Sequence, residues 1–79
     1  MGVLDDLADE LARDALDAGD RMGQNEYYRE VAKVLSESSA TLEETFLTSI
    51  RIRLAERRGR AFLTETLSNF AKEAKRPSS

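Results

Sequence analysis

The sequence predicts an all-α protein, folded as a small antiparallel bundle of three or four helices. The chain is rich in Ala, Leu, Glu, Arg and Asp and contains a single proline, Pro77, near its end. That composition favours helices. Apolar residues recur at helical spacing in several stretches. Short runs rich in Gly, Asn or Ser separate these stretches, as connections between helices do.

The length of the chain limits the core that it can form. At 79 residues it is one domain at most, and a chain this short buries only about 60% of the surface that its unfolded form exposes. Disulfides and a Cys/His zinc site are excluded as supports, because the sequence contains no Cys and no His. Oligomerisation is the natural supplement for so small a core. We therefore expect a homodimer, with a well-packed monomer as the alternative.

The first predicted helix precedes Gly23 and is amphipathic. On an ideal helix its apolar residues fall in a stripe about 100° wide, and its acids lie on the other side. The stripe consists of Leu4, Leu7, Ala8, Leu11, Ala15, Ala18 and Met22. Gly23 suits the left-handed conformation that ends many helices, and Asn25 can cap the next one.

A second helix is predicted to follow this glycine. Its apolar residues at helical spacing are Tyr27, Tyr28, Val31, Val34 and Leu35. The stretch "SESSAT" interrupts the pattern, and Thr41 with Glu44 has the spacing of a capping box that opens a third helix. The alternative is one helix over residues 25–58, because Leu42 and Phe46 stay in phase with the preceding stripe. We favour the break.

The third helix is predicted to present Phe46, Leu47, Ile50 and Leu54. The stretch "LTSIRIRL" also alternates like a strand, but its flanks are helix formers and a single strand has nothing to pair with. Beyond Gly59 a new stripe begins, which on a straight helix lies roughly 140° around from Ile50 and Leu54. One small core cannot bury both faces of a straight helix. We therefore expect a kink or a break near Gly59.

These stripes define the predicted core and domain limits. The core or interface positions are Leu4, Leu7, Leu11, Tyr28, Val31, Leu35, Leu42, Phe46, Ile50, Leu54, Leu63, Leu67 and Phe70. A single helical domain is expected over residues 1–76, with residues 77–79 as a disordered tail.

Charge is distributed unevenly along the chain. Residues 1–22 carry seven acids and two arginines, a net charge of −5. Residues 23–50 carry five acids and two bases, a net charge of −3. Residues 51–79 carry eight bases and three acids, a net charge of +5. The formal net charge of −3 therefore hides a strong asymmetry between the two ends.

Five arginines are concentrated in the stretch "IRIRLAERRGRAF". On a helix Arg53, Arg57 and Arg60 form one basic ridge, with Arg51 and Arg58 on the opposite flank. Three interpretations are open: a solvated helix face, ion pairs with acids of the first helix within the chain or across a dimer, and phosphate binding to nucleic acid. The sequence pI of about 4.9 disfavours nucleic acid, because its binders are usually basic.

Tyr27 and Tyr28 form the only tyrosine pair of the chain. The two tyrosines either pack in the core with their hydroxyls at its rim or anchor a partner, since Tyr is enriched at binding hot spots. We favour the core. Tyr27 is kept as a candidate partner-binding residue together with the basic ridge, Arg53, Arg57 and Arg60.

The missing residue types argue against catalysis. Without His and Cys, the commonest general base and the best nucleophile are absent, so we expect no enzyme, cofactor, metal or small-molecule ligand. No signal-peptide or membrane-spanning pattern is visible, so the cytoplasm is the expected location and no membrane partner is expected. The predicted function is a small protein–protein interaction or regulatory module that acts through amphipathic helix faces. The alternative is a nucleic-acid-associated regulator, and a mimic of nucleic acid through the acidic helix is a weaker third.

Overall fold

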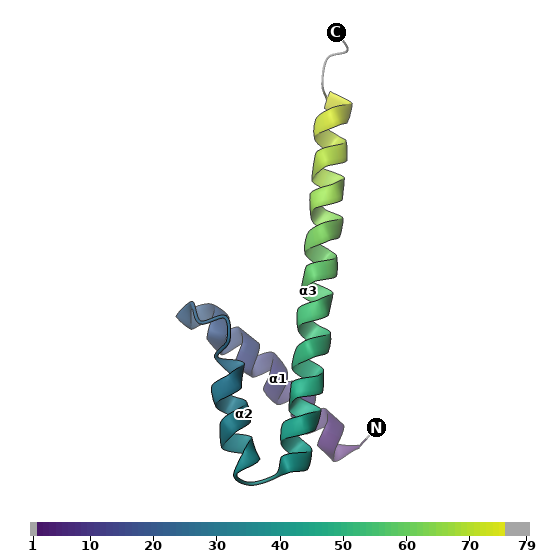
Figure 1. Ribbon diagram of the computed structural model, residues 1–79. Helices are drawn as coiled ribbons and strands as arrows, with labels where there is room; N and C mark the ends of the chain where they lie inside the picture. The colour runs from purple at the N-terminus through teal and green to yellow at the C-terminus, as the bar shows by residue number, and fades with distance from the viewer. Residues whose placement is uncertain (1, 76–79) are drawn as a thin grey trace.

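The computed structural model describes residues 2–75, which are helical apart from two short connections. The helices are α1 (Val3–Met22), α2 (Tyr28–Ser36) and α3 (Ala40–Lys75). The predicted all-α class is confirmed for these residues. α2 and α3 run side by side in opposite directions, and α1 lies obliquely across α3 (Figure 1). The far half of α3 projects beyond the other helices, which gives principal extents of 64 × 29 × 13 Å.

The end of α1 follows the prediction. Gly23 adopts the left-handed conformation, with φ of 68°. The N–H of Gly23 donates to the carbonyl of Asp20 at 3.3 Å, and that of Gln24 donates to the carbonyl of Gly19 at 2.8 Å. This pair of bonds is a Schellman motif, which satisfies carbonyls that the helix itself leaves without a partner.

The predicted cap of α2 at Asn25 is wrong. α2 begins only at Tyr28, and the residue before it makes no side-chain capping bond. Residues 25–27 form a turn instead, in which the N–H of Tyr27 donates to the carbonyl of Gln24 at 3.2 Å. Asn25 therefore lies too far before the helix for its side chain to serve as the cap.

The predicted break between the second and third helices is confirmed, but its cap is not the expected one. α3 begins at Ala40, and the hydroxyl of Ser39 accepts a hydrogen bond from the N–H of Leu42 at 3.1 Å. Ser39 is therefore the N-cap. The capping box predicted at Thr41 and Glu44 is wrong, because the helix has already begun before Thr41.

The kink or break expected near Gly59 is also wrong. α3 is one continuous helix of 36 residues. A Cβ atom added at Gly59 would have no neighbour within 4 Å, so no packing from the described residues bends the chain there. The prediction assumed that both apolar faces of this helix enter one core. The second face instead projects beyond the core and is left uncovered.

The core lies where α1 and α2 pack against the first half of α3. The buried side chains are Ala8, Ala12, Ala15, Leu16, Ala32, Phe46 and Ile50. The predicted positions that pack partly buried against them are Leu11, Tyr28, Val31, Leu35, Leu42 and Leu54. The interior is built mostly from small side chains, which allow the helices to approach closely.

Two groups of predicted core positions are exposed within this chain. Leu4 and Leu7 are exposed because the buried face of α1 is centred about 70° around the helix from the centre of the predicted stripe, so that only the alanine edge of that stripe is buried. Leu63, Leu67 and Phe70 are exposed because α1 and α2 do not reach the projecting half of α3. These residues belong to no core of the single chain.

Candidate interaction surface

The projecting segment of α3, defined here as residues 55–74, is exposed at every position. Its sequence is rich in helix-forming Ala, Arg, Leu and Glu, which explains why it continues the helix without support from other elements. An ion pair between Arg60 and Glu56, one turn apart, adds to this local stability, with a distance of 2.8 Å from Nη2 to Oε2. The segment therefore presents a helix surface to the solvent.

Large apolar side chains gather on one side of this segment and of the turn that precedes it. We call this surface the exposed face, and its residues are Ile52, Phe62, Leu63, Leu67 and Phe70. Each is between 54% and 71% exposed. On an ideal helix they fall within a sector of about 140°, nearly opposite the buried Phe46 and Ile50. α3 thus has two apolar faces, and only one of them is covered by the described residues.

The exposed face begins beside the bundle. Ile52 lies at the level where α1 packs on α3, because its neighbour Arg53 binds Asp9 of α1. From Ile52 to Phe70 the face is about 27 Å long at the usual helical rise. Glu56 and Gly59 lie in the same sector between Ile52 and the larger apolar group that begins at Phe62. Exposed apolar groups of this kind commonly mark interaction sites.

The sequence interpretation found part of this face and missed the rest. Leu63, Leu67 and Phe70 were predicted as core or interface, whereas Ile52 and Phe62 were not singled out. Ile52 precedes Leu63 by eleven residues, close to three helical turns, so a straight helix aligns the two. The assumed break near Gly59 removed that alignment.

The first arginine of the basic ridge is held by the chain itself. Arg53 binds the same carboxylate oxygen of Asp9 through Nη2 at 2.9 Å and through Nε at 3.0 Å. The hydroxyl of Ser49 donates to this oxygen at 2.7 Å. The hydrogen bond from Ser49, followed by that from Arg53, lowers the pKa of Asp9 below its ordinary value.

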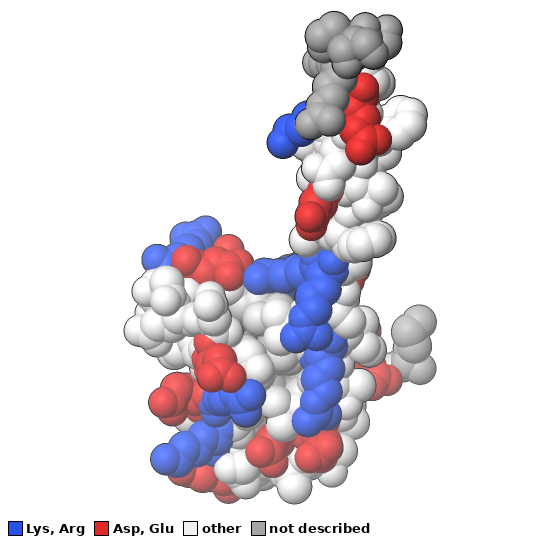
Figure 2. Space-filling model, turned by 45° about the horizontal axis from the view of Figure 1, so that its top comes forward, with Lys and Arg blue, Asp and Glu red and all other residues white. Residues whose placement is uncertain are grey.

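The rest of the basic ridge is engaged as well. Arg57 makes two parallel hydrogen bonds to Asp20, at 3.2 Å and 2.9 Å. Arg60 pairs with Glu56 of its own helix. Arg53 and Arg57 therefore form the ion pairs with acids of the first helix that one of the three interpretations predicts. Figure 2 shows the basic side chains gathered along α3 beside the bundle, while the projecting end carries few charges.

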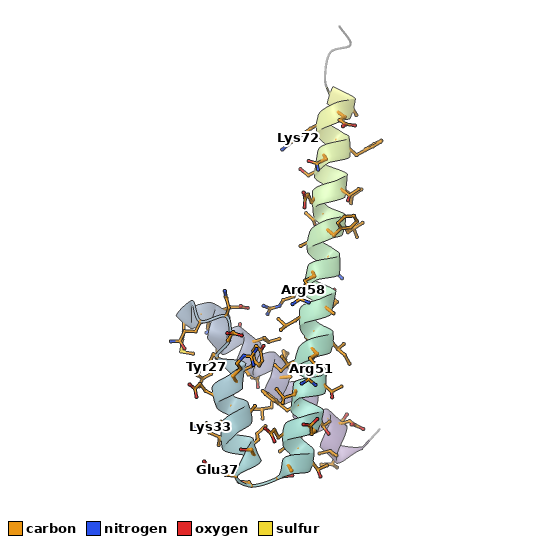
Figure 3. All side chains as sticks on the ribbon, viewed as in Figure 1. Tyr27, Lys33, Glu37, Arg51, Arg58 and Lys72 are labelled. Carbon is orange, nitrogen blue, oxygen red and sulfur yellow. The ribbon has the colours of Figure 1, made fainter. Side chains whose placement is uncertain are left out.

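Two further arginines have no carboxylate partner among residues 2–75. Arg51 and Arg58 are exposed and form no ion pair with the described residues. Figure 3 shows both on the part of α3 beside the bundle, with Lys72 near the far end. The uncompensated positive charge of α3 is therefore concentrated near the bundle.

Tyr27 lies in the connection between α1 and α2 (Figure 3) and is partly buried. It lines a hollow of about 130 Å³ together with Tyr28, Gly19 and Arg57. This volume is below the roughly 300–1,000 Å³ of ordinary ligand pockets. The structure brings Tyr27 and Arg57 together at this hollow, and it places neither of them on the exposed face.

A shallow apolar groove lies on the outer side of α1. Leu7, Leu11 and Leu42 line it, with Glu10 and Asp14 at its rim. Leu7 is 53% exposed, so this groove also leaves apolar surface open to the solvent. It lies between α1 and the first turn of α3, to which Leu42 belongs.

Comparisons with known protein families, curated proteins and solved structures give no match. The described helices include none with the length and apolar character that a membrane crossing requires. The chemistry of the exposed face is therefore the basis on which a function can be inferred.

Proposed function

We propose that this protein is a small helical interaction module without catalytic activity, and that its binding surface is the exposed face of α3. One observation carries the proposal: five large apolar side chains, all more than half exposed, lie on one side of a helix that projects from its own core. Fully burying such a side chain stabilises an assembly by about 1.5–3 kcal/mol. A partner that covers the face recovers part of that free energy.

The shape of the face favours a helix as the partner. Leu63, Leu67 and Phe70 follow the spacing of three and four that helix-in-groove and helix-to-helix contacts use. A helix that packs along α3 would extend the small core into an antiparallel helical bundle. We propose that the module has a regulatory role in the cytoplasm, where it acts by binding and releasing helical partners.

Nucleic-acid binding is the second candidate, and one observation supports it. Arg51 and Arg58 form no ion pair with residues 2–75 and are open to a phosphate. Against it, Arg53 and Arg57 are already paired with carboxylates of α1, and a phosphate would have to displace these carboxylates. We therefore rank this function below protein binding.

Affinity capture from a lysate of the source organism, treated with nuclease, tests the proposed function. Wild type is compared with the double variant Leu67→Gln/Phe70→Gln, which makes two positions of the exposed face polar. Ser68→Gln is the matched control, because it places the same side chain on the other side of α3. We expect protein retained by wild type and by Ser68→Gln and lost from the double variant.

Two results would reject the proposal. Retention that the double variant leaves unchanged shows that the exposed face is not the binding surface. Retention that disappears with nuclease in all three proteins points to nucleic acid, and loss of that binding in Arg51→Gln/Arg58→Gln would then assign it to these arginines.

A further inference from the structure

We propose that the exposed face is covered by α3 of a second copy of this chain, packed antiparallel with a two-fold axis near Phe62. This inference rests on the proposed function, because it names the partner of the same surface. It is carried by the extent of the face, by the charges on its flank and by the position of the bundle relative to it.

The extent of the face fits a small but specific dimer. A fully exposed large apolar residue has an area of about 200 Å², so the five residues of the face, at 54% to 71% exposure, present roughly 600 Å² on each copy. Two copies would then bury on the order of 1,200 Å² in total, at the lower end of the range for stable protein interfaces. When it is fully covered, the face thus reaches the area of a small specific interface.

The charges of α3 distinguish the two possible directions. A parallel pair would bring Arg51 and Arg58 of both copies to the same level, and neither arginine has a carboxylate partner among residues 2–75. An antiparallel pair separates these charges along the helix axis. Unlike charges attract and like charges repel most strongly at short range, so the antiparallel direction is favoured.

The antiparallel pair also supplies a partner for one of these arginines. Arg51 and Glu73 each lie eleven residues from Phe62, so a two-fold axis at Phe62 brings Arg51 of one copy level with Glu73 of the other. On an ideal helix both residues lie on the same flank of the exposed face, within about 40° of each other. Equivalent flanks meet in an antiparallel pair, so two such ion pairs form across the dimer.

The bundle leaves room for this arrangement. The side of α3 that α1 and α2 bury is centred on Phe46 and Ile50, and α1 reaches the edge of the exposed face where Asp9 bonds Ser49 and Arg53. Ile52 is exposed beside the bundle, so the face is open there to the tip of a second helix. In the antiparallel pair Phe70 of the second copy comes level with residue 54, within one turn of Ile52. Each copy's tip therefore covers the apolar residue at the base of the other.

Sedimentation equilibrium over about 1–300 µM tests the dimer. The expected mass rises from that of the 8.9 kDa chain to twice that value across this range. Leu67→Gln/Phe70→Gln is expected to raise the dissociation constant at least tenfold, while Ser68→Gln leaves it within twofold of wild type. These positions are exposed in the single chain, so helix content measured by circular dichroism should be unchanged in the variants.

A spin label tests the direction of packing. The sequence contains no cysteine, so Lys72→Cys provides a single attachment site at an exposed position away from the face. In the antiparallel dimer the two labels are separated by about 30 Å along the helix axis alone, whereas in a parallel dimer they lie at the same level. Electron–electron double resonance should therefore give a distance above about 30 Å.

Three results would overturn the inference. They are a monomer at all concentrations, a dimer that the double variant does not weaken, and a label distance well below 30 Å. A monomeric wild type that still captures a protein through Leu67 and Phe70 rejects the second copy but leaves the proposed function intact. A monomer whose captured proteins do not depend on these residues rejects both.

Discussion

Ile50 and Ile52 lie on opposite faces of α3: Ile50 is 1% exposed and Ile52 is 64% exposed. A step of two residues turns a helix by about 200°. At this level of α3 both apolar faces are therefore present, on opposite sides of the helix. Ile50 belongs to the core with Phe46, and Ile52 begins the exposed face. The two isoleucines therefore have different roles, although only one residue separates them.

Truncation of these two isoleucines should have very different effects on the stability of the single chain. Ile50→Ala leaves a cavity in the core and should lower the free energy of unfolding by about 2–5 kcal/mol. Ile52→Ala should change it by no more than about 0.5 kcal/mol. Urea unfolding near 1 µM, where the chain is expected to be monomeric, measures both. Equal losses would show that Ile52 is part of the core.

Gly19 and Gly59 should respond in opposite directions to alanine. A Cβ at Gly19 would lie 2.7 Å from the carbonyl oxygen of Gln24 and 3.4 Å from Cβ of Tyr27, so Gly19→Ala must displace backbone and should lower stability by about 1–3 kcal/mol. A Cβ at Gly59 meets nothing within 4 Å. Gly59→Ala should raise helix stability by about 1 kcal/mol, the difference in propensity. Thermal unfolding of both variants checks the signs.

The pair Arg57 and Asp20 should contribute modestly and depend on salt. Their side chains are 47% and 54% exposed, and exposed pairs are typically worth about 0.2–1 kcal/mol. A double-mutant cycle with Arg57→Gln and Asp20→Asn should give a coupling energy in that range, decreasing at about 1 M salt, where charges are screened within about 3 Å. Arg58→Gln is the control. A coupling that salt leaves unchanged would contradict an ion pair.

Asp9 should titrate below the ordinary pKa of an aspartate. Its pKa is lowered first by the Ser49 hydroxyl and then by Arg53. Because the pKa is lower in the folded state, ionised Asp9 stabilises the fold above its unfolded pKa, near 4. This stabilisation is lost as the pH falls through the folded-state pKa. NMR titration should show an upward shift of the Asp9 pKa in both Ser49→Ala and Arg53→Gln, and a pKa that neither substitution changes would contradict the assignment.

Local signals in the sequence predicted the limits of two elements. Gly23 ends α1 in the left-handed conformation because a residue without a Cβ adopts it at little cost. The serine-rich connection separates α2 from α3, although its cap is Ser39 and not Thr41. Capping residues of the same type stand next to one another there, and the sequence alone does not say which of them comes immediately before the first turn.

The core of α1 was predicted less well. The leucines Leu4 and Leu7 have the strongest apolar signal, but the alanines Ala8, Ala12 and Ala15 are buried. A helix that crosses its neighbours at close range needs small side chains at the contact, and larger ones lie at the rim. Whether small or large apolar side chains occupy the contact depends on the distance between the helices. Periodicity along one helix gives no information about that distance.

Whether α3 is continuous or broken at Gly59 decides where the exposed face lies, and periodicity alone does not decide between the two. The sequence predicted that a straight α3 would carry two apolar stripes on different sides. The continuous helix carries both stripes. The expected break at Gly59 followed from assuming one core within one chain. In the proposed dimer that requirement does not apply, because α1 and α2 cover one face and the second copy covers the other.

NMR spectra of the labelled chain at about 5 µM and about 500 µM show which surface meets a partner when the chain is concentrated. We expect amide shifts to change along the exposed face, from Ile52 through Leu63 and Leu67 to Phe70, while those of Phe46 and Ile50 in the core stay constant. Spectra that do not change with concentration, or changes confined to the arginines and Tyr27, would contradict the assignment of the exposed face as the interaction surface.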